Sequence, residues 1–99
     1  EGPAGSPRYT RASYESDFAA IDAEIRAMQA LLNERRAELD PSTIAVLEKS
    51  LALIDQAIDE SRAALLSDPA SQFLAAQLAR SYNTKLTLLR ATATTPVGS

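Results

Sequence analysis

The chain has no glycine between Ser6 and Val97, and this gap constrains its fold more than any other feature of the sequence. Glycine supplies the positive φ angles that tight turns need, so a β protein with many turns is hard to build without it. Alanine and leucine, the strongest helix formers, supply most of the hydrophobic residues. The predicted fold class is therefore all-α.

Two Asp-Pro dipeptides, at 40–41 and 68–69, divide this stretch into three long segments. Proline disfavours the helical conformation in the residue before it but fits the first turn of the helix that follows. We therefore predict amphipathic helices near 13–39, 41–67 and 69–92, a flexible lead or linker at 1–12 and a polar tail at 93–99. Short joints favour antiparallel neighbours, so the product is an elongated three-helix bundle or a dimerising helical hairpin.

The aspartates of the two joints, Asp40 and Asp68, are predicted to be helix caps. A carboxylate just ahead of a helix accepts hydrogen bonds from backbone N–H groups that have no partner inside the helix. Each aspartate would end one helix and cap the next. Its replacement by alanine would then lower the free energy of unfolding.

The first two predicted helices carry apolar residues at alternating spacings of three and four, as in a heptad seam, and the third carries them mostly four residues apart. The predicted inward residues are Tyr14, Phe18, Ile21, Ile25, Met28, Leu32 and Leu39, then Ile44, Leu47, Leu51, Ile54, Ile58 and Leu65, then Phe73, Leu74, Leu78, Tyr82, Leu86 and Leu89. The first two helices are acidic, whereas the third has bases and no acid. Opposite charges on neighbouring helices favour this packing, although burial drives it.

A weaker apolar stripe on the middle helix predicts a self-association surface around Val46, Leu53 and Leu66. Long, thin cores are marginal, and two-fold dimers are the commonest oligomers. The alternative is that these residues complete the core of a monomer. The sequence leaves both alternatives open.

The residues predict no catalytic, cofactor-binding or metal site. The chain has no cysteine and no histidine, so thiolate ligands, imidazole ligands and thiol nucleophiles are excluded. Asp55, Asp59 and Glu60 are interpreted as a solvated helix face, because oxygen-ligand cation sites need more ligands on a turning loop. Ser61, at a seam position, has no base to activate it. We predict that the chain is not an enzyme.

The stretch from Leu39 to Arg90 begins with Leu-Asp-Pro, continues as a helix rich in leucine, isoleucine and aspartate, and ends after a second Asp-Pro in a helix with Leu78, Ala79 and Tyr82. It resembles the C-terminal helical region of bacterial zinc-finger, membrane-anchored anti-sigma factors. The resemblance implies a regulatory protein-interaction domain on the extracytoplasmic, periplasmic side of a membrane. A zinc module and a membrane anchor would precede Glu1.

The expected partner is another protein or a second copy of the chain. Nucleic acid is not expected, because its binders carry a basic excess and this chain has a net charge of −3. The segment itself is predicted to be soluble, since it has no apolar run of about 18 residues.

A second resemblance, of residues 67–82 to the first helix of a tetratricopeptide repeat, implies a cytoplasmic scaffold or oligomerisation module, which could also be of coiled-coil type. The helical pattern continues through Leu89, however, and the joints recur at 28 residues instead of about 34.

Overall fold

The computed structural model describes the backbone of residues 11–94 and the side chains of residues 18–94. It contains helix α1 (Arg11–Arg35), a single turn of 3₁₀ helix η1 (Arg36–Glu38), helix α2 (Pro41–Ser67) and helix α3 (Gln72–Ala93). The described residues contain no strand, so the all-α prediction is confirmed. The side chain of Tyr14, residues 1–10 of the predicted lead and residues 95–99 of the predicted tail lie outside this description.

The middle helix has the predicted bounds, and the other two differ at their ends. α1 begins two residues earlier than predicted, and after Arg35 the chain tightens into η1 before the first joint. α3 begins at Gln72, three residues later than predicted, because residues 68–71 form a turn.

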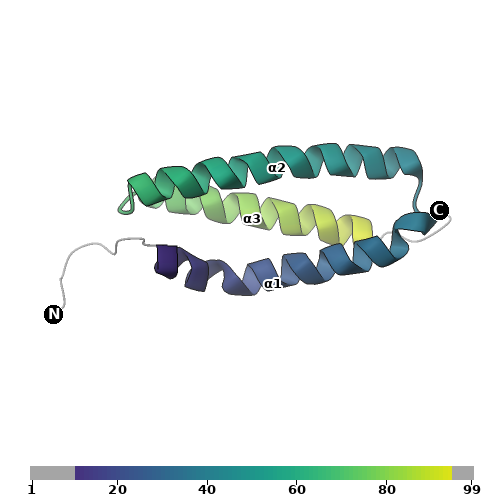
Figure 1. The fold of residues 1–99 in the computed structure, drawn as a ribbon, viewed down its shortest axis with the longest axis horizontal. Helices are drawn as coiled ribbons and strands as arrows, with labels where there is room; N and C mark the ends of the chain where they lie inside the picture. The colour runs from purple at the N-terminus through teal and green to yellow at the C-terminus, as the bar shows by residue number, and fades with distance from the viewer. Residues whose placement is uncertain (1–10, 95–99) are drawn as a thin grey trace.

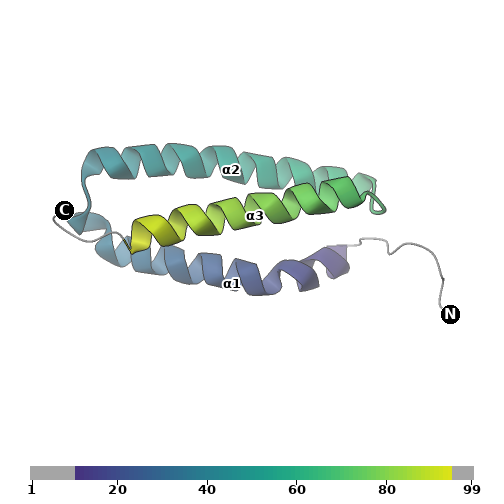
Figure 2. The same ribbon diagram turned by 180° about the vertical axis from the view of Figure 1, so that it is seen from behind.

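α3 is the central helix of the bundle. It packs along both α1 and α2, whereas α1 and α2 make few contacts with each other. Figures 1 and 2 view the molecule from opposite sides, and in both α3 lies between the other two helices. Each helix runs antiparallel to the one before it (Figure 1). The fold is therefore an elongated three-helix bundle held together by its third helix.

The core lies where α3 meets its two neighbours. Leu65, Leu78 and Leu89 are completely buried. The other buried apolar residues are Ile25, Leu32, Ile44, Leu47, Ile58, Tyr82, Leu86 and Ala93. All of these except Ala93 occupy predicted inward positions. Burying one leucine side chain contributes roughly 1.5–3 kcal/mol, so this seam holds the helices together.

Phe73 departs from the predicted set of inward residues. It was expected to face inward, but it is 68% exposed. Adjacent residues in an α-helix lie about 100° apart around the axis, so Phe73 and Leu74 point to different sides of α3. Leu74 packs against the core, and Phe73 projects from the first turn of α3 into solvent. The prediction for Phe73 is wrong.

An ion pair joins α3 to each of its neighbours. Lys85 Nζ lies 2.6 Å from Asp55 Oδ1 of α2, and Arg90 Nη2 lies 2.7 Å from Glu24 Oε2 of α1. The prediction that a basic third helix complements two acidic ones is confirmed. Pairs at the surface contribute only about 0–1 kcal/mol each, so they orient the helices more than they stabilise them.

Asp40 closes the first joint as the N-cap residue of α2, with Pro41 in the first turn. Its carboxylate accepts hydrogen bonds from the backbone N–H and the hydroxyl of Ser42, each at 2.9 Å. These bonds, the backbone one first, lower the pKa of Asp40 because they stabilise its charged form. Arg36 Nη2 also lies 2.7 Å from Glu48 Oε2, which fastens η1 to α2.

The second joint is built differently, and the prediction that Asp68 caps the third helix is wrong. The Asp68 N–H donates to the Ala64 carbonyl at 2.9 Å and so ends α2. The Asp68 carbonyl accepts from the Ser71 N–H at 3.1 Å, which closes a turn with Pro69 in its second position. The N-cap residue of α3 is Ser71, whose hydroxyl accepts from the Leu74 N–H at 3.1 Å.

The C-terminal end of α3 is capped from α1. The Arg35 guanidinium donates a hydrogen bond to the Ala93 carbonyl. The last carbonyls of a helix have no partner inside it and form the negative end of its dipole, so a cation there is favourable. Arg35 therefore ties the end of α1 to the end of α3.

Candidate functional site

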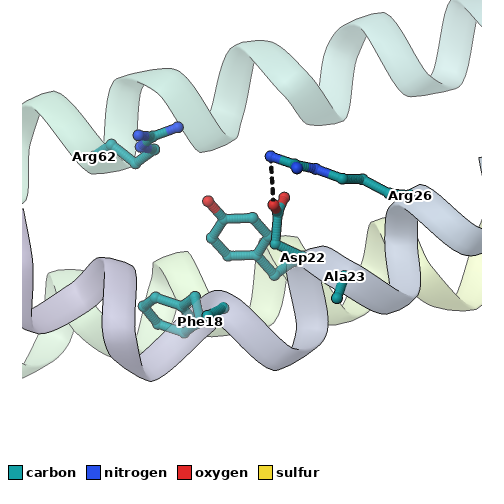
Figure 3. Close-up of a pocket in the computed structure, with 7 residues that line it drawn as sticks. Phe18, Asp22, Ala23, Arg26 and Arg62 are labelled. Carbon is teal, nitrogen blue, oxygen red and sulfur yellow. Dashed lines mark ion pairs between the residues drawn. The ribbon is translucent and has the colours of Figure 1, made fainter.

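A cleft lies between α1 and α2, with α3 behind it (Figure 3). Its volume is about 590 Å³. The described residues that line it are Phe18, Ala19, Asp22, Ala23 and Arg26 of α1, Arg62 of α2 and Tyr82 of α3. The cleft follows from the packing of the bundle, because α1 and α2 each pack on α3 and contact each other little.

Phe18 and Tyr82 form the apolar wall of the cleft. Their rings stack with centroids 5.1 Å apart and an interplanar angle of 27°. Tyr82 is buried and Phe18 is half-buried, so Phe18 presents the more accessible ring. A stacked pair of this kind contributes about 0.5–1.5 kcal/mol beyond its burial. The pair also fixes the position of the N-terminal part of α1 against α3.

Two arginines give the rim of the cleft its charge. Arg26 of α1 and Arg62 of α2 point toward one another across the opening (Figure 3). Arg26 Nη2 lies 3.0 Å from Asp22 Oδ2, and the Arg26 side chain is 79% exposed. Arg62 is half-buried. Two arginines and one aspartate give the described lining a net charge of +1, in a chain whose net charge is −3.

This combination of groups fits an acidic protein segment. A guanidinium presents planar donors that match a carboxylate, and it also stacks on aromatic rings. The apolar wall beside the arginines provides a surface for an apolar side chain of the same segment. The cleft is thus suited to recognition of a side-chain pair, one acidic and one apolar.

The sequence identified only part of this cleft. Phe18 and Tyr82 were predicted as inward residues, but Asp22, Arg26 and Arg62 were not singled out. Asp22 and Arg26 follow Phe18 at intervals of four, which places all three on one side of α1, and this spacing was an available sign of a shared surface. Arg62 gave no such sign, because its place opposite Arg26 depends on how α1 and α2 pack around α3.

The residues considered for chemistry lie elsewhere. Ser61 is 5% exposed and occupies its predicted seam position on α2. Asp55, from the acidic cluster with Asp59 and Glu60, pairs with Lys85. Among residues 18–94 the structure shows no group of three or more acids, histidines or cysteines that could hold a metal ion.

The residues predicted for self-association are all exposed, but they do not form one strip. The exposed fractions are 67% for Val46, 63% for Leu53 and 38% for Leu66. Val46 and Leu53, seven residues apart, lie within about 20° of each other around α2, whereas Leu66 is about 140° from Leu53. Leu66 therefore belongs to another side of the helix, and of the three predicted residues only Val46 and Leu53 share a side.

In the part of the chain that the structure describes, no helix combines the length and the apolar character needed to cross a membrane. Comparison of the chain with protein-family models, with curated proteins and with solved structures finds no match. The resemblance of Leu39–Arg90 to anti-sigma factors consequently rests on its sequence pattern.

Proposed function

We propose that this chain is a non-enzymatic regulatory domain that binds another protein through the cleft between α1 and α2. The observation that carries the proposal is the placement of Arg26 and Arg62, on different helices, beside one aromatic wall. A partner segment with a carboxylate and an apolar side chain would contact both helices at once. It would supply between α1 and α2 the packing that these helices do not supply to each other.

The sequence resemblance supports a more specific role for such a domain. We propose that the chain is the extracytoplasmic part of an anti-sigma-factor-like membrane protein, with its membrane anchor upstream of Glu1. Contact with a partner outside the membrane would then regulate an inhibitory module on the other side. The partner would be a protein and not a nucleic acid, in keeping with the net charge of −3.

Deletion of the encoding gene in its own organism tests the anti-sigma role. We expect a defined set of transcripts to rise, because an anti-sigma factor holds its sigma factor inactive, and expression of the full-length protein should reverse the rise. An unchanged transcript profile under all conditions of growth and envelope stress would remove this role. It would leave the proposed binding cleft untouched.

Arg62→Glu in the full-length protein tests the cleft, with Arg80→Glu as the matched control. Both residues are arginines on the same bundle, but Arg80 is exposed on α3 and lies outside the cleft. We expect Arg62→Glu to change the regulated transcription and Arg80→Glu to leave it as in the wild type. Circular dichroism checks that both variants are folded. Where deletion of the gene changes transcription, equal behaviour of the two folded variants would show that the cleft does not bind the partner.

One observation favours a second function, a coiled-coil-like scaffold or oligomerisation module. Val46 and Leu53 are large apolar residues exposed on one side of α2. A tetratricopeptide-like module has less support, because α3 continues unbroken for 22 residues where that repeat turns after about 14. A scaffold without a regulatory role would form oligomers and leave transcription unchanged on deletion.

A further inference from the structure

One side of α2 carries an apolar strip that the rest of the bundle covers only in part. This outer strip consists of Val46, Leu53, Ala57 and Ala64, which lie within about 40° of one another around the helix axis. Val46 and Leu53 are 67% and 63% exposed, and the two alanines are half-buried. The spacings of seven, four and seven are those of a helix that packs against another helix.

The outer strip is asymmetric along α2, since its large residues precede its alanines. A second α2 lying antiparallel places Val46 and Leu53 against the alanines of the other copy. A parallel copy would place large residues against large ones and leave alanine facing alanine. We propose that the outer strip is a homodimer interface in which two copies of α2 pack antiparallel about a two-fold axis.

Charge at the edge of the strip sets the register of this dimer. Lys49 and Glu60 flank the strip on the same side, about 20° apart around the axis. A two-fold axis that crosses α2 between positions 54 and 55 brings Lys49 level with Glu60 of the second copy. By symmetry, Lys49 of the second copy lies level with Glu60 of the first, so the dimer contains two such pairs. The same axis places Val46 beside Ala64 of the second copy. Parallel pairing would instead place the two Lys49 side chains on opposite edges of the interface, away from Glu60 of the other copy.

The charges concerned are available within the monomer. Within residues 18–94, Lys49 has no ion-pair partner. Glu60 accepts a hydrogen bond from Gln56 at 3.2 Å and pairs with no base in the same range. Because one helix face is smaller than the roughly 800 Å² per partner of a standard interface, we expect a weak dimer. The inference does not depend on the cleft, which involves another side of α2.

Engineered cysteines test the antiparallel register directly, because the chain contains no cysteine of its own. Lys49→Cys and Glu60→Cys proteins are mixed in equal amounts, oxidised mildly and analysed by mass spectrometry. We expect the mixed 49–60 disulfide to dominate. Like residues in the proposed dimer are about 16 Å apart along the axis, beyond the 7 Å that a disulfide spans. A random mixture of the three products, or dominance of the like pairs, would overturn the register.

Sedimentation equilibrium tests the dimer itself, with Leu53→Glu and Leu66→Glu as a matched pair. Both leucines are on α2, but only Leu53 belongs to the outer strip. We expect the wild type and Leu66→Glu to dimerise with similar constants and Leu53→Glu to weaken dimerisation at least tenfold. A wild type that stays monomeric at high micromolar concentration refutes the interface, as does a stronger effect at Leu66. Should Leu53→Glu fail to fold by circular dichroism, the wild-type measurement and the disulfide pattern still decide.

Discussion

Replacing Leu78 or Phe73 by alanine tests how α3 packs in the bundle. The apolar pattern of the sequence places both residues inward, but in the structure Leu78 is 0% exposed and Phe73 is 68% exposed. From the sequence pattern alone, the two substitutions should lower the free energy of unfolding by similar amounts. From the structure, Leu78→Ala should lower it far more than Phe73→Ala. Their comparison separates the two descriptions of the same helix.

The expected magnitudes follow from burial. Leu78→Ala removes three carbon atoms from a completely buried site, which costs about 2.4 kcal/mol at about 0.8 kcal/mol per carbon. The cavity left between the helices raises the cost to about 2.5–5 kcal/mol. Phe73→Ala removes a side chain that is already in water, and alanine is the better helix former by about 0.5 kcal/mol. We expect this change to stay within about 1 kcal/mol.

Chemical denaturation followed by circular dichroism measures both costs, at protein concentrations low enough to exclude dimers. A domain of this size has a total stability of roughly 4–12 kcal/mol, so Leu78→Ala should remove a large part of it. The corresponding fall in Tm is about 10–40 °C. If Phe73→Ala costs as much as Leu78→Ala, then α3 is rotated relative to the structure and the described core is wrong.

Three further predictions concern the joints and the charges. Ser71→Ala should cost about 0.5–2 kcal/mol through loss of the α3 cap, whereas Asp68→Ala should change the denaturation midpoint little. The folded-state pKa of Asp40 is lowered, so its contribution to stability is complete above its unfolded pKa of about 3.9 and is lost as the pH falls through the folded value. Asp40→Asn retains the cap without this titration, so in thermal melts the wild type should lose stability relative to it below about pH 4. A double-mutant cycle on Lys85 and Asp55 should give a coupling of about 0.2–1 kcal/mol that falls at high salt.

The two Asp-Pro dipeptides show how far local sequence determines local structure. At 40–41 the aspartate caps the helix that follows, whereas at 68–69 the same pair begins a turn and Ser71 caps the helix. Aspartate and serine are both good N-cap residues, so the local sequence permits either choice. The outcome at the second joint depends on the path by which α3 returns against both earlier helices, and a local pattern contains no information on that path.

The same reasoning explains why the core was predictable and the cleft was not. Heptad spacing states which side of each helix is apolar, and that side is buried wherever helices meet. The cleft is a gap between α1 and α2, which is set by how each of them crosses a third helix. The charge of Arg26 and Arg62 is evident in the sequence, but their meeting across the cleft follows only from the packed bundle.

The two proposed surfaces of α2 can be occupied at the same time. Leu53 and Arg62 are nine residues, or two and a half turns, apart, so they project from opposite sides of α2. A dimer through the outer strip would leave the cleft of each copy open and would bind a partner with two acidic segments bivalently, with an effective concentration in the millimolar range. If both proposals hold, we expect Leu53→Glu to bind a surface coated with a glutamate- and leucine-rich helical peptide at least about tenfold more weakly than the wild type does. The protein concentration in this comparison lies above the dimer dissociation constant. The affinity of Leu53→Glu for the same peptide free in solution should not change, whereas Arg62→Glu should weaken both. Equal loss of both affinities in Leu53→Glu would show that the two sides of α2 do not act independently.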